Sequence, residues 1–129
     1  MAYTAPTGEV IVQEGTFMYN FTASGTVLKG EPVCAPDSTT FGLAKAATRA
    51  TAASCIGVAA YPQTDGKKLG VYGPGNIVRI TVSGASVVAG DILMPTEYGW
   101  CDSDGYPSGH AICLQTQATT TGTTIALLI

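Results

Sequence analysis

The stretch SVVAGDIL, residues 86–93, decides how this chain folds, because the chain contains the same pattern twice. Residues 26–33, TVLKGEPV, repeat its order of an apolar pair, a glycine, an acidic residue and a second apolar pair. Equivalent positions lie 60 residues apart, as Gly30 and Gly90 show. An internal repeat of this kind predicts that two similar β-units build the fold.

Each copy of the motif predicts a strand that ends in a tight turn and restarts as another strand. Gly30 and Gly90 supply the left-handed backbone conformation that the turn needs. Glu31 and Asp91 follow them, and short acidic side chains cap backbone amides in such bends. We therefore assign these four residues a structural role in turns rather than an acid/base role.

Short strand patterns with Gly and Pro turns continue along the chain at spacings of about 8–12 residues, which is typical of an all-β barrel or sandwich. The sequence thus predicts an all-β fold: a small β-barrel or β-tulip-like domain over residues 26–129, with its repeat at 26–76 and 86–129. A short helical turn is expected only between Lys45 and Ala53. In the second unit, residues 111–114 are expected to match residues 55–58.

Residues 1–25 stand apart as an extended N-terminal arm and first strand. Residues 3–8 are interrupted by Pro and Gly, whereas residues 9–15 and 16–22 have β-prone apolar and aromatic patterns. This mixture is typical of a segment that docks on something. The sequence leaves open whether that is its own barrel or a partner.

Composition narrows the function classes. Only 12% of the 129 residues are charged, about half of the ~25% usual for soluble domains. Two interpretations are equally favoured: a surface that neighbours cover, or a Thr-rich β-protein kept soluble by its hydroxyls.

The net charge of −3 and six scattered basic residues argue against nucleic-acid binding, and no apolar run is long enough to span a membrane. With neither a basic start nor an apolar core at the N-terminus, we expect no signal peptide and synthesis in a cytoplasm.

The four cysteines, Cys34, Cys55, Cys101 and Cys113, have no metal-ligand spacing. We expect buried, reduced thiols, with a disulfide as the less favoured alternative. Cys55 and Cys113 are expected at similar points of the two units.

The residues that usually carry catalysis are sparse. His110 has no nucleophile motif to serve, and residues 102–105 (DSDG) resemble a calcium loop without its remaining ligands. Gly70–Gly75 is glycine-rich but precedes no predicted helix that could hold a phosphate. We expect no enzyme activity, no metal and no cofactor. Tyr98 and Trp100 are either an exposed aromatic patch or part of the core, and the core is favoured.

The order V-x-x-G-[DE]-x-[VL], then a strand [IC]-I-G-V-A, a glycine turn and a V-x-V/I strand resembles the small capsid decoration proteins of tailed bacteriophages. The resemblance covers roughly residues 24–129, and the second unit departs from it where residues 114–116 (LQT) replace Gly-Val-Ala. The residues that carry it are Gly30, Glu31, residues 55–59, Gly66, Gly75, Val78, Gly90, Asp91 and Gly122.

The resemblance implies a virion protein on the capsid exterior. Members of that family bind the expanded shell, often as homotrimers, and stabilise it against the pressure of packaged DNA. The implied partners are the major capsid protein and further copies of this chain. Residues 2–15 would be a capsid-binding arm that pairs with the shell as an added strand, through Tyr3, Thr4, Pro6, Val10, Ile11 and Val12.

Two alternatives remain at this point. The chain is either another virion component, such as a head fibre or a tail-associated subunit, or a carbohydrate-binding β-domain that uses Tyr98, Trp100 and Tyr106.

Overall fold

The computed structural model describes residues 3–36, 42–84, 86–103, 109–119 and 121–129 and confirms the all-β prediction. No helix of these residues has the length and apolar character to cross a membrane. The strands are β1 (Ile11–Gln13), β2 (Met18–Ala23), β3 (Pro32–Cys34), β4 (Leu43–Ala46), β5 (Cys55–Ala59), β6 (Lys68–Tyr72), β7 (Ile77–Ser83), β8 (Ile92–Thr96), β9 (Gly99–Asp102), β10 (Ala111–Cys113) and β11 (Thr121–Leu128), with one 3-10 turn, η1 (Arg49–Ser54).

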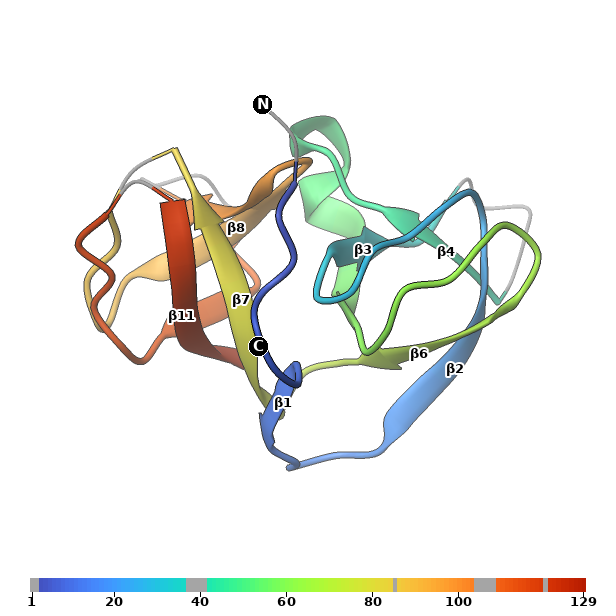
Figure 1. Cartoon of the computed structure of the whole chain (residues 1–129), viewed down its shortest axis with the longest axis horizontal. Coiled ribbons are helices and arrows are strands. Elements are labelled where there is room, and N and C mark those ends of the chain that lie inside the picture. Colours follow the sequence, from blue (N-terminus) through green and yellow to red (C-terminus); the bar gives the residue numbers. More distant parts are fainter. Residues whose placement is uncertain (1–2, 37–41, 85, 104–108, 120) are drawn as a thin grey trace.

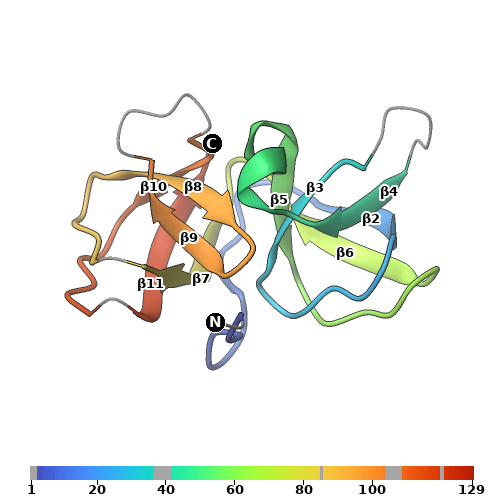
Figure 2. The ribbon, with the colours of Figure 1, turned by 90° about the horizontal axis from the view of Figure 1, so that it is seen from above.

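The strands form two barrels of one topology, side by side (Figures 1 and 2). Barrel 1 is closed by the order β2-β4-β3-β5-β6. Barrel 2 has the order β7-β11-β10-β8-β9, and pairing of β9 with β7 brings its ends together. Each barrel contains one parallel pair, β2 with β4 and β7 with β9, and four antiparallel pairs. The two predicted β-units are therefore each a ring of their own.

This arrangement corrects the predicted boundaries. One barrel over residues 26–129 is replaced by two, and β2, assigned to the arm region, is the first strand of barrel 1. Its equivalent β7 lies between the two predicted repeats. The sequence predicts too short a repeat because the aromatic-rich β2 and the aliphatic β7 do not resemble each other in sequence.

The number of residues that separates equivalent positions of the two units is not constant along the chain. The backbone N–H of Gly30 donates to Ala59 O at 2.8 Å, and Gly90 N–H donates to Cys113 O at 2.7 Å. The equivalent of Cys113 is therefore Ala59 and not Cys55, and the offset falls from 60 to 54 residues. The connection between β3 and β4, residues 35–42, is longer than its counterpart between β8 and β9, residues 97–98, and this difference accounts for most of the change.

The short helical turn expected between Lys45 and Ala53 is present as η1. It begins only at Arg49, because Lys45 and Ala46 belong to β4.

Each barrel has its own apolar core, and the motif supplies one fully buried valine to each, Val27 and Val87. Trp100 is fully buried in the core of barrel 2, as the favoured interpretation predicts. Val58 of barrel 1 and Val10 of the N-terminal segment belong to the same cluster. An apolar contact between the barrels therefore fixes how they sit relative to each other.

Candidate functional site

The repeated motif builds the same hydrogen-bonded turn in both barrels. A carboxylate oxygen of Glu31 accepts from Leu28 N–H at 3.0 Å, and one of Asp91 accepts from Val88 N–H at 2.8 Å. Gly30 and Gly90 adopt φ of 73° and 100°, where a side chain is disfavoured. The acidic residues thus act locally, each holding the amide three residues before it.

The two turns differ in burial, which leads to a pH prediction. Glu31 is only 7% exposed, and burial raises the pKa of its carboxyl above the ordinary value of 4.5, although the bond from Leu28 N–H opposes the shift. A raised folded-state pKa means that the stabilising contribution is present at low pH and is lost as pH rises through that pKa.

We expect Glu31→Gln, which keeps the acceptor oxygen, to be at least as stable as the parent at neutral pH. The stability difference between the two should shrink as pH falls from neutral, through the raised pKa, towards 4.5. Urea unfolding of both proteins from acidic to neutral pH measures it. Asp91→Asn makes the same chemical change at the more exposed turn of barrel 2 and serves as the matched control. A Glu31→Gln variant that is less stable at neutral pH than at acidic pH, relative to the parent, would contradict this assignment.

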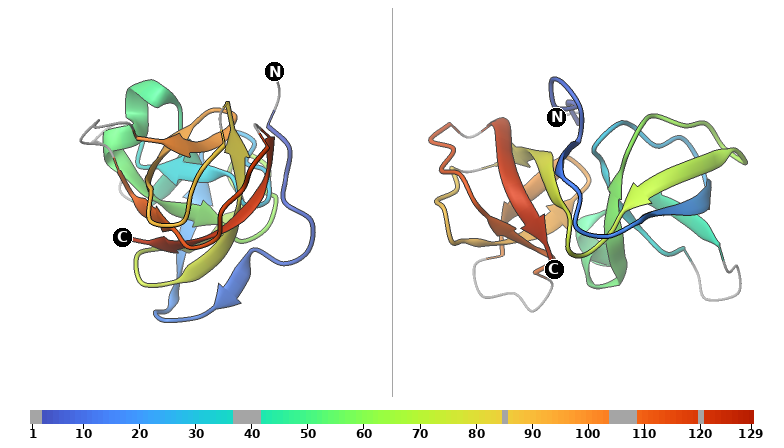
Figure 3. Two further views of the ribbon diagram at one scale, coloured as in Figure 1. Left: turned by 90° about the vertical axis from the view of Figure 1, so that its left-hand side faces the viewer. Right: turned by 90° about the horizontal axis from the view of Figure 1, so that it is seen from below.

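The N-terminal segment runs between the two barrels, as the dark blue ribbon shows (Figures 1 and 3). We call residues 3–16 the strap. On barrel 1, Tyr3 Oη donates to Lys29 O at 2.7 Å, and Lys29 Nζ donates to Gly8 O at 2.7 Å. Pro6 is buried against Gly30, where an added Cβ would come within 2.9 Å of its ring.

The strap also binds barrel 2. Thr81 Oγ1 donates to Thr4 O at 2.6 Å, and Arg79 N–H donates to Val10 O at 2.6 Å. β1 adds to the edge of β7 in antiparallel register, with Ile11 opposite Val78. Because the strap bonds to both barrels, it joins them.

Of the six residues predicted to contact a partner, five contact the chain's own barrels and one, Val12, faces solvent. Pro6 and Val10 are buried, and Tyr3 and Ile11 are half-buried against the chain's own barrels. Thr4 is exposed but gives its carbonyl to barrel 2, whereas Val12 is 41% exposed.

The turn from β1 to β2 is held by a residue that the sequence did not single out, Asn76. Its side chain is fully buried, and its Oδ1 accepts from Gly15 N–H at 2.9 Å and from Thr16 N–H at 3.1 Å. Its Nδ2 donates to Thr16 Oγ1 and to Gly73 O at 2.9 and 3.1 Å. Asn76 thus locks the β1–β2 turn to the connection between the barrels.

This rigid turn presents large apolar groups to solvent. Phe17 is 89% exposed, and Tyr19 and Val12 are 53% and 41% exposed. We call residues 12–19 the apolar corner; it is the lower corner of Figure 1, where β1 leads into β2. Among the described strands, β1 pairs with β7 alone, so its other edge is open beside this surface.

An open groove of about 470 Å³ runs beside the apolar corner, between the strap and barrel 1. It is mostly apolar and aromatic, with Glu9 and Lys29 as its charged residues. The lining residues are Gly8, Glu9, Val10, Ile11, Met18, Lys29, Ala60, Tyr61 and Tyr72. Met18 of the apolar corner also lines this groove, so the two features adjoin, and both are suited to contact rather than to catalysis.

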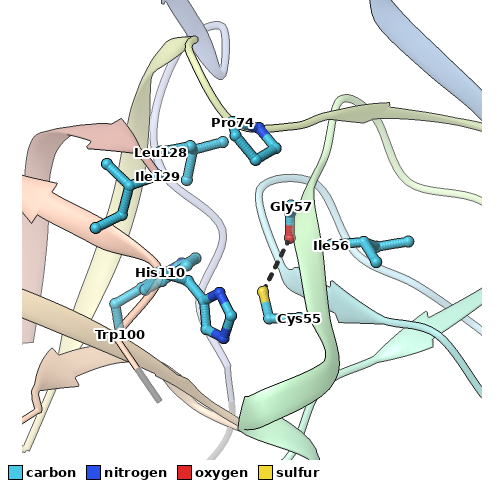
Figure 4. Close-up of a pocket in the computed structure, with 8 residues that line it drawn as sticks. All are labelled: Cys55, Ile56, Gly57, Pro74, Trp100, His110, Leu128 and Ile129. Carbon is cyan, nitrogen blue, oxygen red and sulfur yellow. Dashed lines mark hydrogen bonds between the residues drawn. The ribbon is translucent and has the colours of Figure 1, made fainter. Parts of the chain in front are cut away.

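The residue types that usually carry chemistry lie away from this surface. His110 lines a small cavity between the barrels with Trp100 and Cys55, and Figure 4 shows its ring facing the Cys55 side chain. No group of three or more His, Cys, Asp or Glu side chains suited to a metal ion occurs within the described ranges. Of the aromatic patch, Trp100 is buried and Tyr98 is half-buried, while Tyr106 and the second half of the DSDG stretch lie outside the described residues.

The sequence matches no protein-family model and no curated protein. The function is therefore inferred from the surfaces described above.

Proposed function

We propose that this chain is a capsid decoration protein: it binds the outer surface of an expanded bacteriophage shell and stabilises the shell against the pressure of packaged DNA. Its partner is the major capsid protein, and its place is the virion exterior. The apolar corner is the contact surface. The observation that carries the proposal is Phe17, which is almost fully exposed on a turn that the protein holds rigid.

The energetics favour Phe17 as an anchor. Burying a phenylalanine side chain contributes roughly 1.5–3 kcal/mol, and aromatic anchors supply much of the binding energy of interfaces. Because Asn76 already orders the turn, little conformational entropy is lost on docking. An exposed phenylalanine on a flexible loop would bind less tightly, because the loop would lose conformational entropy on docking.

The open edge of β1 supplies the second contact. An extended segment of the shell adds to β1 as a further strand, and its main-chain hydrogen bonds contribute affinity. β1 is only three residues long, so each copy binds weakly. A homotrimer would present three such corners at once, and avidity would then raise the overall affinity. The scarcity of charge, 12% of residues, suits a protein that neighbours cover on several sides.

We expect Phe17→Ser to weaken binding to expanded shells by roughly tenfold or more. Val88→Ser is the matched control, since Val88 is 56% exposed at the motif turn of barrel 2, outside the apolar corner. Co-sedimentation with expanded and unexpanded shells measures both. Equal losses in the two variants would remove the corner from the interface, and a parent chain that binds neither shell would overturn the proposed function.

A further inference from the structure

The cysteines of barrel 1 form a pair that the sequence did not indicate. Cys34 in β3 and Cys55 in β5 are directly opposite each other in antiparallel register, although 21 residues separate them in the chain. The other two cysteines, Cys101 and Cys113, lie in β9 and β10 of barrel 2. All four are thiols in this structure.

The two side chains of the pair point to the same face. Val33 packs in the core of barrel 1, so the next residue in β3, Cys34, points out of that core. In β5, Ile56 packs against the core of barrel 1, whereas Cys55 packs against the core cluster of barrel 2. The register of β3 with β5 shifts between Val33 and Cys34, which marks a β-bulge at this point of the pair. Both thiols therefore lie on the outer face of barrel 1 that meets barrel 2.

Directly opposed residues of an antiparallel pair have Cα atoms about 4.5–5.5 Å apart. Disulfides span Cα separations of about 4.4–6.8 Å. The backbone of β3 and β5 is thus already placed for a bond, and the side chains need only rotate. Each thiol now contacts a carbonyl, Cys34 Sγ that of Ala46 at 3.9 Å and Cys55 Sγ that of Gly57 at 3.7 Å, and these weak contacts are readily given up.

We propose that Cys34 and Cys55 are a cross-strand redox pair, which a small-molecule disulfide such as oxidised glutathione converts into a covalent link between β3 and β5. The half-buried Cys55 reacts first: its thiolate attacks one sulfur of the oxidant, and one small thiol leaves. The thiolate of Cys34 then attacks the Cys55 sulfur and expels the second small thiol. Two protein S–H bonds and one S–S bond are replaced by one protein S–S bond and two small thiols, which take up the two protons.

The surroundings make this reaction slow but leave its product stable. Burial raises the pKa of the Cys55 thiol to about 12, and the neighbouring Cys34 adds to the shift, so little thiolate forms at neutral pH. Cys34 is fully buried, so it is reached mainly from Cys55 rather than from solvent. A link across 21 residues constrains the unfolded chain and should raise the melting temperature by roughly 10 °C.

The experiment incubates the folded full chain with oxidised glutathione for an extended time, blocks the remaining thiols in denaturant and maps tryptic peptides by mass spectrometry. Trypsin cuts after Lys45 and Arg49, which separates Cys34 from Cys55, whereas Cys101 and Cys113 stay together beyond Arg79. We expect a linked pair of peptides carrying Cys34 and Cys55, and a rise in melting temperature that a reducing agent reverses. Cys113→Ser should behave as the parent, and Cys34→Ser and Cys55→Ser should give no such link.

Four intact thiols after the incubation would overturn the proposal. So would a link that involves Cys101 or Cys113, or glutathione that remains attached to Cys55 without closure onto Cys34. Mapping of the parent chain decides among these outcomes even where a serine variant fails to fold. The result does not depend on capsid binding, so the redox pair and the decoration function succeed or fail separately.

Discussion

Gly57→Ala should destabilise the protein by at least about 4 kcal/mol, near the upper end of what single substitutions cost. Gly57 lies in β5 with φ of 154°, and a Cβ there would come within 2.0 Å of Tyr72 O and 2.9 Å of Tyr72 C. These are backbone atoms of the paired strand β6, so no side-chain rotation relieves the clash. Small proteins have only about 5–15 kcal/mol of total stability, so barrel 1 would come close to unfolding.

Gly66→Ala is the matched control for this prediction. Gly66 also has a positive φ, 81°, but nothing lies within 4 Å of an added Cβ. It should therefore cost only the left-handed penalty of about 1–2 kcal/mol. Urea unfolding followed by circular dichroism measures both variants. If Gly57→Ala costs no more than Gly66→Ala, the close approach of β5 to β6 is not as the structure has it.

Asn76→Ala should cost about 2–4 kcal/mol and loosen the apolar corner. The substitution leaves the N–H groups of Gly15 and Thr16 without their acceptor and removes two donated bonds from a fully buried site. Each buried polar group left without a partner costs roughly 1–3 kcal/mol. Because the same bonds order the turn that carries Phe17, the variant should also bind expanded shells more weakly than the parent.

Asn20→Ala makes the same chemical change on the exposed part of β2 and should alter stability by less than about 0.5 kcal/mol. Amide hydrogen exchange adds a local measurement: the Gly15 and Thr16 amides should exchange faster in Asn76→Ala and remain protected in Asn20→Ala. Unchanged exchange at both amides in Asn76→Ala would show that Asn76 does not hold the turn.

The features that the sequence predicts correctly are local ones. The turn of each motif needs only a glycine, an acidic residue and the amide three positions before it, so Gly30–Glu31 and Gly90–Asp91 are readable from the chain. Alternation and turn residues likewise suffice for the all-β class. The burial of Trp100 follows from its place in a strand-forming stretch.

The features that it misses depend on contacts between distant segments. Closure of barrel 1 rests on the parallel pairing of β2 with β4, and no local pattern signals that pairing. The exposure of Phe17 depends on Asn76, which is 59 residues further along the chain. The GPG turn before Asn76 is a usable signal for a tight reversal, but not for what the side chain binds. The Cys34–Cys55 pair is hidden for the same reason, since its register is set by a bulge.

The strap also changes how the N-terminal segment is understood. The sequence leaves open whether this segment binds its own barrels or a partner. In the structure, Tyr3, Pro6 and Val10 pack against the barrels. Deleting residues 2–15 would remove Val10 from the core cluster and the turn from Asn76, so it would damage the fold along with any interface. Point substitutions on the apolar corner separate the two effects.

The most direct test of the proposed function compares phage particles that carry this protein with particles assembled without it, and measures the temperature at which packaged DNA is released on heating. The decoration proposal predicts bound protein on the mature shell and release at a higher temperature when it is present, with Phe17→Ser giving particles that behave as if the protein were missing. Equal release temperatures in all three preparations, with no protein on the shell, would contradict it.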